Sequence, residues 1–140
     1  MCCVTREPID AQAIAGEAIA GHRFVASFSA IVRPRGDPPC VAVEFAAYES
    51  MAERMLRETA EEAAARWGVR AVIAQRIGLV GVGQTSLVVS VGADDRATAF
   101  EACAYCVDRL MGEAPVWRAE VGADGSRVWI DGEQSALPVQ

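Results

Sequence analysis

The sequence contains no lysine, and all 13 of its basic residues are arginines. No side-chain amine is therefore available for Schiff-base chemistry or for proton transfer, and arginine cannot replace it because its pKa stays above about 12. The 19 acidic residues give a formal net charge of −6. This balance argues against a protein that coats nucleic acid, since such a protein needs a dominant basic face.

Histidine and long apolar runs are also scarce. His22 is the only histidine, and its sequence context supports neither a Ser-His-Asp triad nor a metal site, so we expect a surface residue at a strand edge. No apolar run approaches the roughly 20 residues that a membrane-spanning helix needs. Residues 1–8 lack the basic flank and apolar stretch of a signal peptide. We therefore expect a cytoplasmic protein that does not engage a membrane.

Cysteine is present at Cys2, Cys3, Cys40, Cys103 and Cys106, which we interpret as reduced thiols. Cys103 and Cys106 form a CxxC motif, but a redox CxxC works at a helix N-terminus, and this one lies inside a predicted helix. A zinc site that adds Cys2 and Cys3 would need adjacent ligands, which is poor geometry. We expect core cysteines, no metal and no cofactor, and keep a thiol-redox or zinc protein as the weaker alternative.

The length of 140 residues and the 52% hydrophobic content predict one domain spanning residues 1–140. Strands and helices alternate only partly, which favours an α+β fold with a mostly antiparallel sheet and two long helices. The first predicted helix covers residues 10–20 and is capped by Asp10. The second covers residues 50–67 and begins with a capping box of Ser50 and Glu53. The third covers residues 94–114 and ends before Pro115. The predicted strands cover residues 23–32, 41–48, 69–77, 85–91, 116–120 and 127–130, with a glycine-rich loop at 78–83.

Apolar residues recur at intervals of three and four along the last predicted helix. This spacing predicts a core-facing stripe formed by Phe100, Cys103, Ala104, Val107, Leu110 and Met111.

Five arginines stand near predicted element ends. Arg33 and Arg35 follow the first long strand, Arg96 lies in the first turn of the last helix, and Arg118 and Arg127 lie on the C-terminal hairpin. A fold that brings these ends together would create a cationic pocket suited to a small phosphorylated ligand. The alternative is that each is a solvated surface charge.

Five short segments occur in one order along the chain, at residues 30–33, 43–53, 75–78, 95–102 and 114–118. From about Ala20 to Ile130 the sequence thereby resembles the large, catalytic subunit of molybdopterin synthase. The resemblance implies an α/β hammerhead fold and a homodimer. It also implies a ubiquitin-like sulfur-carrier small subunit, whose C-terminal thiocarboxylate enters the active site. Two sulfurs in all are transferred to cyclic pyranopterin monophosphate to form molybdopterin. No metal is implied at this step.

The resemblance also assigns site positions. Arg33 and Arg96 match family arginines, and we expect them to bind substrate together with Asp95, which stands where the family has histidine. Met111 and Arg118 occupy the positions of two family lysines that belong to the catalytic site. Arg118 can still bind an anion but cannot deliver a proton, and Met111 has neither charge nor proton to offer. Two hypotheses follow: a divergent synthase, or a non-catalytic paralogue that binds the carrier or a small phosphorylated ligand.

Overall fold

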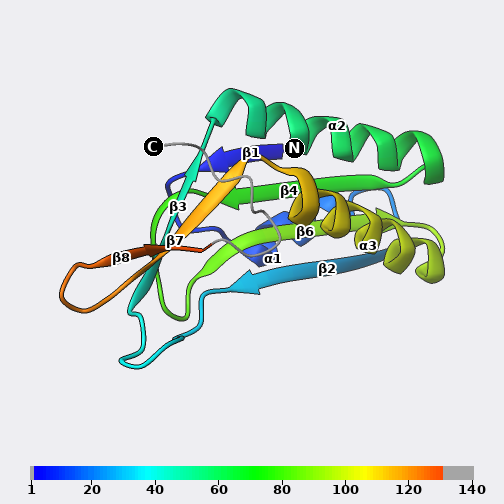
Figure 1. The fold of residues 1–140 in the computed structure, drawn as a ribbon. Coiled ribbons are helices and arrows are strands. Elements are labelled where there is room, and N and C mark those ends of the chain that lie inside the picture. The colour runs from blue at the N-terminus through cyan, green and yellow to red at the C-terminus, as the bar shows by residue number, and fades with distance from the viewer. Residues whose placement is uncertain (1, 131–140) are drawn as a thin grey trace.

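The computed structural model describes residues 2–130, which form three helices and eight strands (Figure 1). In chain order these are β1 (Cys2–Thr5), α1 (Ala11–Ala18), β2 (Phe24–Ile31), β3 (Ala42–Ala47), α2 (Glu49–Trp67), β4 (Arg70–Arg76), β5 (Gly78–Gly81), β6 (Thr85–Ala93), α3 (Arg96–Glu113), β7 (Val116–Val121) and β8 (Arg127–Trp129). The α+β prediction is confirmed. Within the described residues, none of the helices is both long and apolar enough to cross a membrane.

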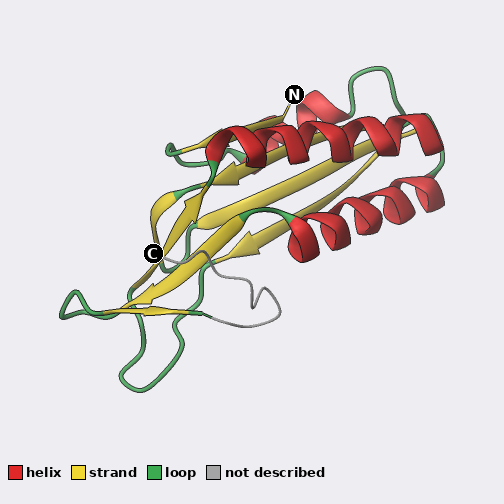
Figure 2. Ribbon diagram, turned by 45° about the horizontal axis from the view of Figure 1, so that its top comes forward, coloured by secondary structure: helices red, strands yellow, loops and turns green. Residues whose placement is uncertain are grey.

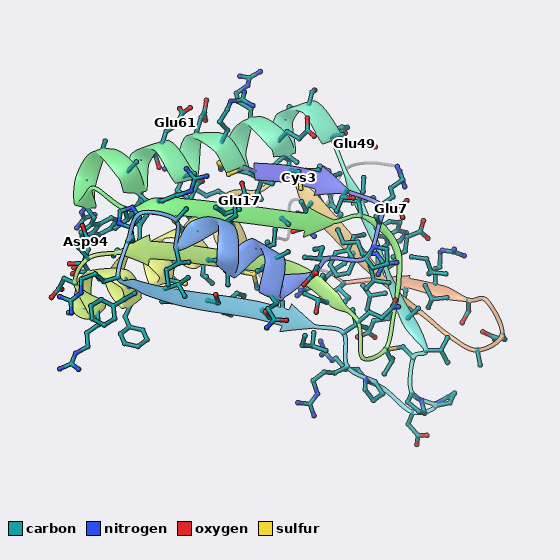
Figure 3. All side chains as sticks on the ribbon, turned by 180° about the vertical axis from the view of Figure 1, so that it is seen from behind. Cys3, Glu7, Glu17, Glu49, Glu61 and Asp94 are labelled. Atoms are coloured by element: carbon teal, nitrogen blue, oxygen red, sulfur yellow. The ribbon has the colours of Figure 1, made fainter. Side chains whose placement is uncertain are left out.

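The strands form two four-stranded sheets with the orders β1-β4-β6-β2 and β5-β3-β7-β8. All pairs are antiparallel except β1 with β4, so the predicted mostly antiparallel arrangement is confirmed. Helices α2 and α3 lie side by side over one face of the first sheet (Figure 2). Helix α1 covers the opposite face, as the view from behind shows (Figure 3).

The core lies on the two central strands of the first sheet, β4 and β6. Val72 and Val88 are fully buried, and so are their neighbours Ile73 and Val89, which join the cluster under α2 and α3. Successive side chains of a strand point to opposite faces. Both faces of the central pair are therefore covered, and each fully buried aliphatic side chain stabilises the fold by about 1.5–3 kcal/mol.

The structure corrects two predicted helix starts. Helix α2 begins at Glu49 with Tyr48 as its N-cap and no side-chain cap, so the capping box of Ser50 and Glu53 is wrong because Ser50 already lies inside the helix. Helix α3 is capped by Asp95 rather than opened by Asp94, and the Asp95 carboxylate accepts a hydrogen bond from the Thr98 amide. The predicted Asp10 cap of α1 is confirmed.

The predicted apolar stripe of α3 is wrong in part. The residues that the helix buries are Ala99, Ala102, Cys103, Cys106 and Leu110. Phe100 is 69% exposed and Met111 is 40% exposed, so both lie outside the buried face. The face of α3 that packs on the sheet carries mostly small side chains, which let the helix lie close to the sheet. A large side chain such as that of Phe100 lies on another face of the helix.

Two strands were missing from the prediction. β1 was not predicted, and β5 lies inside the segment 78–83 that we predicted as a loop. The glycine-rich sequence hid β5, which forms because residues 42–45 of β3 offer an antiparallel partner to residues 78–81. The tight turn that remains before β6 contains Gly83, whose φ is 90°.

Helix α1 approaches β6 most closely at Gly92. A Cβ atom at this position would lie 1.9 Å from the carbonyl oxygen of Ala18. That oxygen belongs to the backbone and cannot rotate away. Gly92 therefore fixes how near α1 can lie to the sheet.

We predict that Gly92→Ala lowers the free energy of unfolding by about 1–3 kcal/mol or more, because the backbones of α1 and β6 must separate. Gly16→Ala is the matched control, since a Cβ there meets nothing within 4 Å and a helical alanine adds up to about 1 kcal/mol. Urea unfolding of the three proteins checks this. Equal stability of wild type and Gly92→Ala would contradict the close approach.

Candidate functional site

Two adjoining hollows lie where the two sheets diverge at the C-terminal end of α3. The first, here called the inner pocket, has a volume of about 80 Å³. The second, the outer hollow, has a volume of about 250 Å³. They share Ala30, Phe45, Ser86, Arg118 and Ile130, so together they form one continuous depression.

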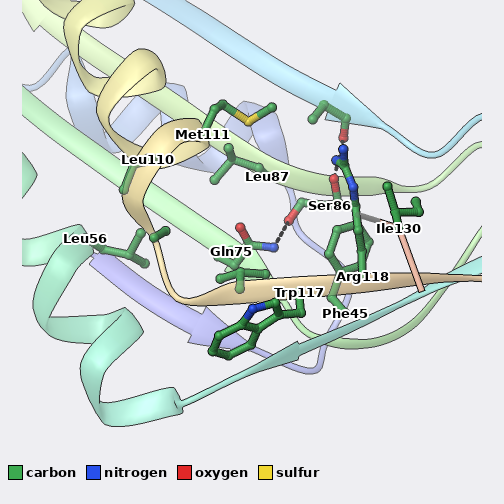
Figure 4. A pocket seen from close by; sticks show the side chains of 13 residues that line it. Phe45, Leu56, Gln75, Ser86, Leu87, Leu110, Met111, Trp117, Arg118 and Ile130 are labelled. Carbon is green, nitrogen blue, oxygen red and sulfur yellow. Dashed lines mark hydrogen bonds between the residues drawn. The ribbon is translucent and has the colours of Figure 1, made fainter. Parts of the chain in front are cut away.

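The inner pocket is mainly apolar and is built by elements that are far apart in sequence (Figure 4). Strand β3 contributes Phe45, β6 contributes Leu87, and the end of α3 contributes Leu110 and Met111. Strand β7 contributes Trp117, whose ring packs edge-to-face against Tyr48 with the ring centroids 4.9 Å apart. Such a pocket favours a flat or apolar group over a hydrated ion.

Arg118 stands at the junction of the two hollows. It lies on β7 opposite Phe45 of β3 and is half-buried. None of the ion pairs formed within residues 2–130 involves it. A partly desolvated guanidinium that forms no ion pair attracts an anion and can hold it through two parallel hydrogen bonds.

Two further predicted arginines line the outer hollow. Arg33 and Arg35 come from the loop after β2, as the sequence predicted. Arg35 also approaches Glu120, with Nε 3.5 Å from the carboxylate. The fold of one chain thus brings Arg33, Arg35, Arg118 and Met111 to the depression.

The other predicted site residues lie elsewhere in the chain fold. Asp95 and Arg96 are at the start of α3 and Met111 is near its end. The 15 residues from Arg96 to Met111 correspond to about 22 Å of helix at 1.5 Å per residue. Arg127 lies outside both hollows and pairs with Glu44. Within one chain, Asp95 and Arg96 therefore do not line the depression.

Asp95 has a clear local role. Its carboxylate accepts hydrogen bonds from both the amide and the hydroxyl of Thr98, each 3.0 Å long. These bonds, the amide first, lower the pKa of Asp95 below its usual value. The negative charge of Asp95 is thus engaged in capping α3.

Sequence reasoning missed two polar residues of the inner pocket, Gln75 and Ser86. The Ser86 hydroxyl donates to the carbonyl of Ala30 at 3.2 Å. The Gln75 amide nitrogen donates to the carbonyls of Arg76 at 2.8 Å and Ser86 at 3.2 Å. The available signal was a polar residue next to an apolar run, Gln75 after residues 71–74 in β4 and Ser86 before residues 87–89 in β6.

The cysteines and the histidine lie away from the depression. Cys103 and Cys106 are buried under the sheet, as predicted for core cysteines. His22 is half-buried, with Nδ1 3.3 Å from an oxygen of Asp94, whereas we predicted a surface residue. No group of three or more histidine, cysteine or acidic residues within residues 2–130 is arranged to hold a metal ion.

These features define an α+β protein of two sheets with a cationic depression at their junction. The chain belongs to the MoaE protein family, whose sequence model matches residues 4–113. It is 40% identical over 109 residues to the molybdopterin synthase catalytic subunit of Nostoc sp., covering 76% of this chain and 66% of that protein. It is 34% identical over 107 residues to the corresponding subunit of Thermoplasma volcanium, covering 75% and 78%.

Solved structures agree with this assignment. The fold superposes on molybdopterin synthase from Staphylococcus aureus with a TM-score of 0.83 and 25% identity, covering 91% of this chain and 94% of that one. A complex of subunits 1 and 2 of the molybdopterin-converting factor from Helicobacter pylori shares the fold, with a TM-score of 0.81 at 20% identity over 94% and 90% of the two chains. The family resemblance drawn from the five short segments is confirmed.

We predict that Cys106 resists alkylation in the native protein at pH 8. Burial, followed by the neighbouring thiols Cys103 and Cys2, raises the pKa of Cys106 to about 12. Compared with a pKa of 9, about a thousandfold less thiolate is then present at pH 8. Iodoacetamide labelling with peptide mass analysis, native against urea-unfolded, checks this.

The raised pKa of Cys106 also makes the free energy of unfolding depend on pH. The folded chain keeps the Cys106 proton to a higher pH than the unfolded chain. Its contribution to stability is therefore complete below about pH 9 and is lost as the pH rises towards 12. Fast native labelling of Cys106, or bound zinc, would instead favour the thiol-redox or zinc alternative.

Proposed function

We propose that this protein is the catalytic, large subunit of a molybdopterin synthase. In this role it transfers sulfur from the thiocarboxylate of a ubiquitin-like small subunit to cyclic pyranopterin monophosphate, and so takes part in molybdenum cofactor biosynthesis. The observation that carries the proposal is the half-buried Arg118 at the junction of the two hollows, where it has no acidic partner within residues 2–130. The names of the Nostoc and Thermoplasma relatives support it.

In this proposal, three arginines bind the phosphate of the substrate. The substrate phosphate lies in the outer hollow, where Arg33 and Arg118 face it and Arg35 adds a third positive charge that Glu120 partly offsets. The pterin ring then points towards the apolar inner pocket. Binding the phosphate anion at one end orients the rest of the molecule, which is the main contribution of such a clamp to catalysis.

Arg118 also supplies charge at the reacting end. Negative charge that develops during sulfur transfer is stabilised by a fixed guanidinium in a partly dry site. Arg118 does not move protons, because its pKa is too high. Met111 lines the inner pocket and contributes apolar surface only. A proton transferred in this site must therefore come from a group other than these two residues.

A second copy of the chain completes the site in this proposal. Phe100, Ala104 and Val107 follow one another at helical spacing on α3, with Phe100 and Ala104 exposed. This stripe runs beside β2, which forms the edge of its sheet within the described residues. An apolar helix face next to an open sheet edge is typical of a homodimer contact.

A two-fold axis across this stripe would make the two α3 helices antiparallel. The start of the partner's α3 would then approach the end of α3 in this copy. Within one chain, these two ends of α3 are about 22 Å apart. Arg96 and Asp95 of each copy would in that way reach the depression of the other. This arrangement restores both to the substrate-binding site that we predicted from the sequence.

We predict that Phe100→Glu shifts the protein from dimer to monomer, because the new charge would be buried without a partner in the apolar contact between the two α3 helices. Val128→Glu is the control, since Val128 is similarly exposed at 65% but lies on the terminal hairpin. Sedimentation equilibrium checks both variants, and we expect a rise in the dimer dissociation constant of at least about a hundredfold for Phe100→Glu. Dissociation by Val128→Glu alone would place the interface on the hairpin.

A non-catalytic paralogue is the second candidate function. The observation that favours it is the absence of lysine from the sequence, together with the resemblance, which implies a family lysine at the position of Met111. Such a protein would keep the fold and bind the sulfur carrier or a small phosphorylated ligand. The complex of the two subunits from H. pylori supports a carrier partner for either function.

Single-turnover conversion of cyclic pyranopterin monophosphate with a thiocarboxylated small subunit tests the proposal. We predict dithiolene product with the wild type and a loss of roughly a hundredfold in rate with Arg118→Met, because a fixed charge is removed. Arg118→Lys retains the positive charge and should retain most of the rate. Arg127→Met is the control on the same hairpin, since Arg127 lies outside both hollows. No product from the wild type, with carrier binding intact, would favour the paralogue.

We also propose that the protein acts in the cytoplasm. All five cysteines are free thiols, and two of them are fully or nearly fully buried in the main core. A protein that depends on reduced core thiols fits a reducing compartment.

A further inference from the structure

Gln75 is one of the two buried polar side chains that line the depression, together with Ser86. It lies on β4 opposite Leu87 of β6, and only 7% of it is exposed. The strand around it is otherwise apolar from Ala71 to Ala74. A glutamine at such a position needs hydrogen-bond partners for both ends of its amide.

The structure satisfies one end only. The amide nitrogen donates to the carbonyl oxygens of Arg76 and Ser86, at 2.8 and 3.2 Å. These two acceptors fix the orientation of the amide, because a flipped amide would place its oxygen against both carbonyls. None of the hydrogen bonds formed within residues 2–130 ends on the Oε1 atom of Gln75. This oxygen is not among the fully buried atoms that lack a partner, so solvent or a ligand can reach it. Figure 4 shows that this oxygen lies on the side away from Ser86, among the lining residues.

The polar groups of the depression therefore follow one another from its closed end to its open end. Gln75 lines only the inner pocket, Arg118 lines both hollows, and Arg33 lines only the outer hollow. A ligand that satisfies all three needs a hydrogen-bond donor at one end, an apolar middle and an anion at the other end.

The size of the inner pocket limits what enters it. Its volume of about 80 Å³ is well below the roughly 150 Å³ of a cavity that holds benzene. A two-ring heterocycle cannot enter whole, so only an edge of the ring does. The exocyclic amino group of a pterin projects furthest from the ring, which makes it the donor able to reach the closed end.

We propose that Gln75 is a specificity-determining residue that accepts a hydrogen bond from the exocyclic amino group of the pterin substrate. The pterin then lies with its amine at Gln75, its rings against the apolar walls and its phosphate at the arginines. This inference rests on the proposed function, and it names the part of the substrate that the inner pocket recognises.

A coupling experiment tests the contact. Equilibrium dialysis compares a pterin that carries a phosphorylated side chain at C6 with its 2-desamino analogue, on the wild type, Gln75→Met and Gln12→Met. Gln12 is an exposed glutamine of α1 and serves as the matched control. We expect the wild type and Gln12→Met to prefer the amino compound roughly tenfold, and Gln75→Met to bind both compounds within about twofold.

A purely structural role for Gln75 would weaken both compounds equally and leave the tenfold preference, which would overturn the inference. A wild type without preference would overturn it as well, whether or not Gln75→Met folds. Dithiolene formation by the same wild-type preparation separates the two proposals. Product without preference would refute the Gln75 contact alone, and preference without product would refute the catalytic function alone.

Discussion

The burial of β4 and β6 on both faces is the constraint on which the rest of the structure depends. Two helices cover one face and α1 covers the other, and the close contact at Gly92 fixes the distance of α1. Because the buried residues of α3 are mostly alanine and cysteine, that helix also lies near the sheet. Its C-terminal end is thereby held over the gap between the two sheets, where the inner pocket forms.

The site depends on the second sheet as much as on the first. Pairing of β3 with β7 sets Phe45 opposite Arg118 and carries the guanidinium to the mouth of the inner pocket. Ser86 and Gln75 reach the same pocket from the first sheet. A site assembled between two sheets keeps an apolar interior while offering a few polar atoms at fixed positions. That arrangement suits the recognition of a flat, phosphorylated heterocycle.

The absence of lysine limits the chemical groups that such a site can use. Arg33 and Arg118 provide fixed positive charge, and arginine retains that charge at any pH at which the protein is folded. Recognition and charge stabilisation are therefore available to this chain, whereas a side-chain amine is not. Asp95 does not oppose this charge within one chain, because it caps α3 at the far end of that helix.

The sequence alone determined the fold class, most helices and strands, the core cysteines, the family and the arginines near the element ends. These depend on local periodicity, on caps such as Asp10 and on the order of short segments. Tertiary structure decided the rest. It paired β5 with β3 despite the glycines, exposed Phe100 and separated Arg96 from Arg118 along one helix. It also buried Gln75 with its amide nitrogen bonded and its oxygen directed into the pocket. Such features depend on contacts between residues far apart in the chain, which local patterns do not encode.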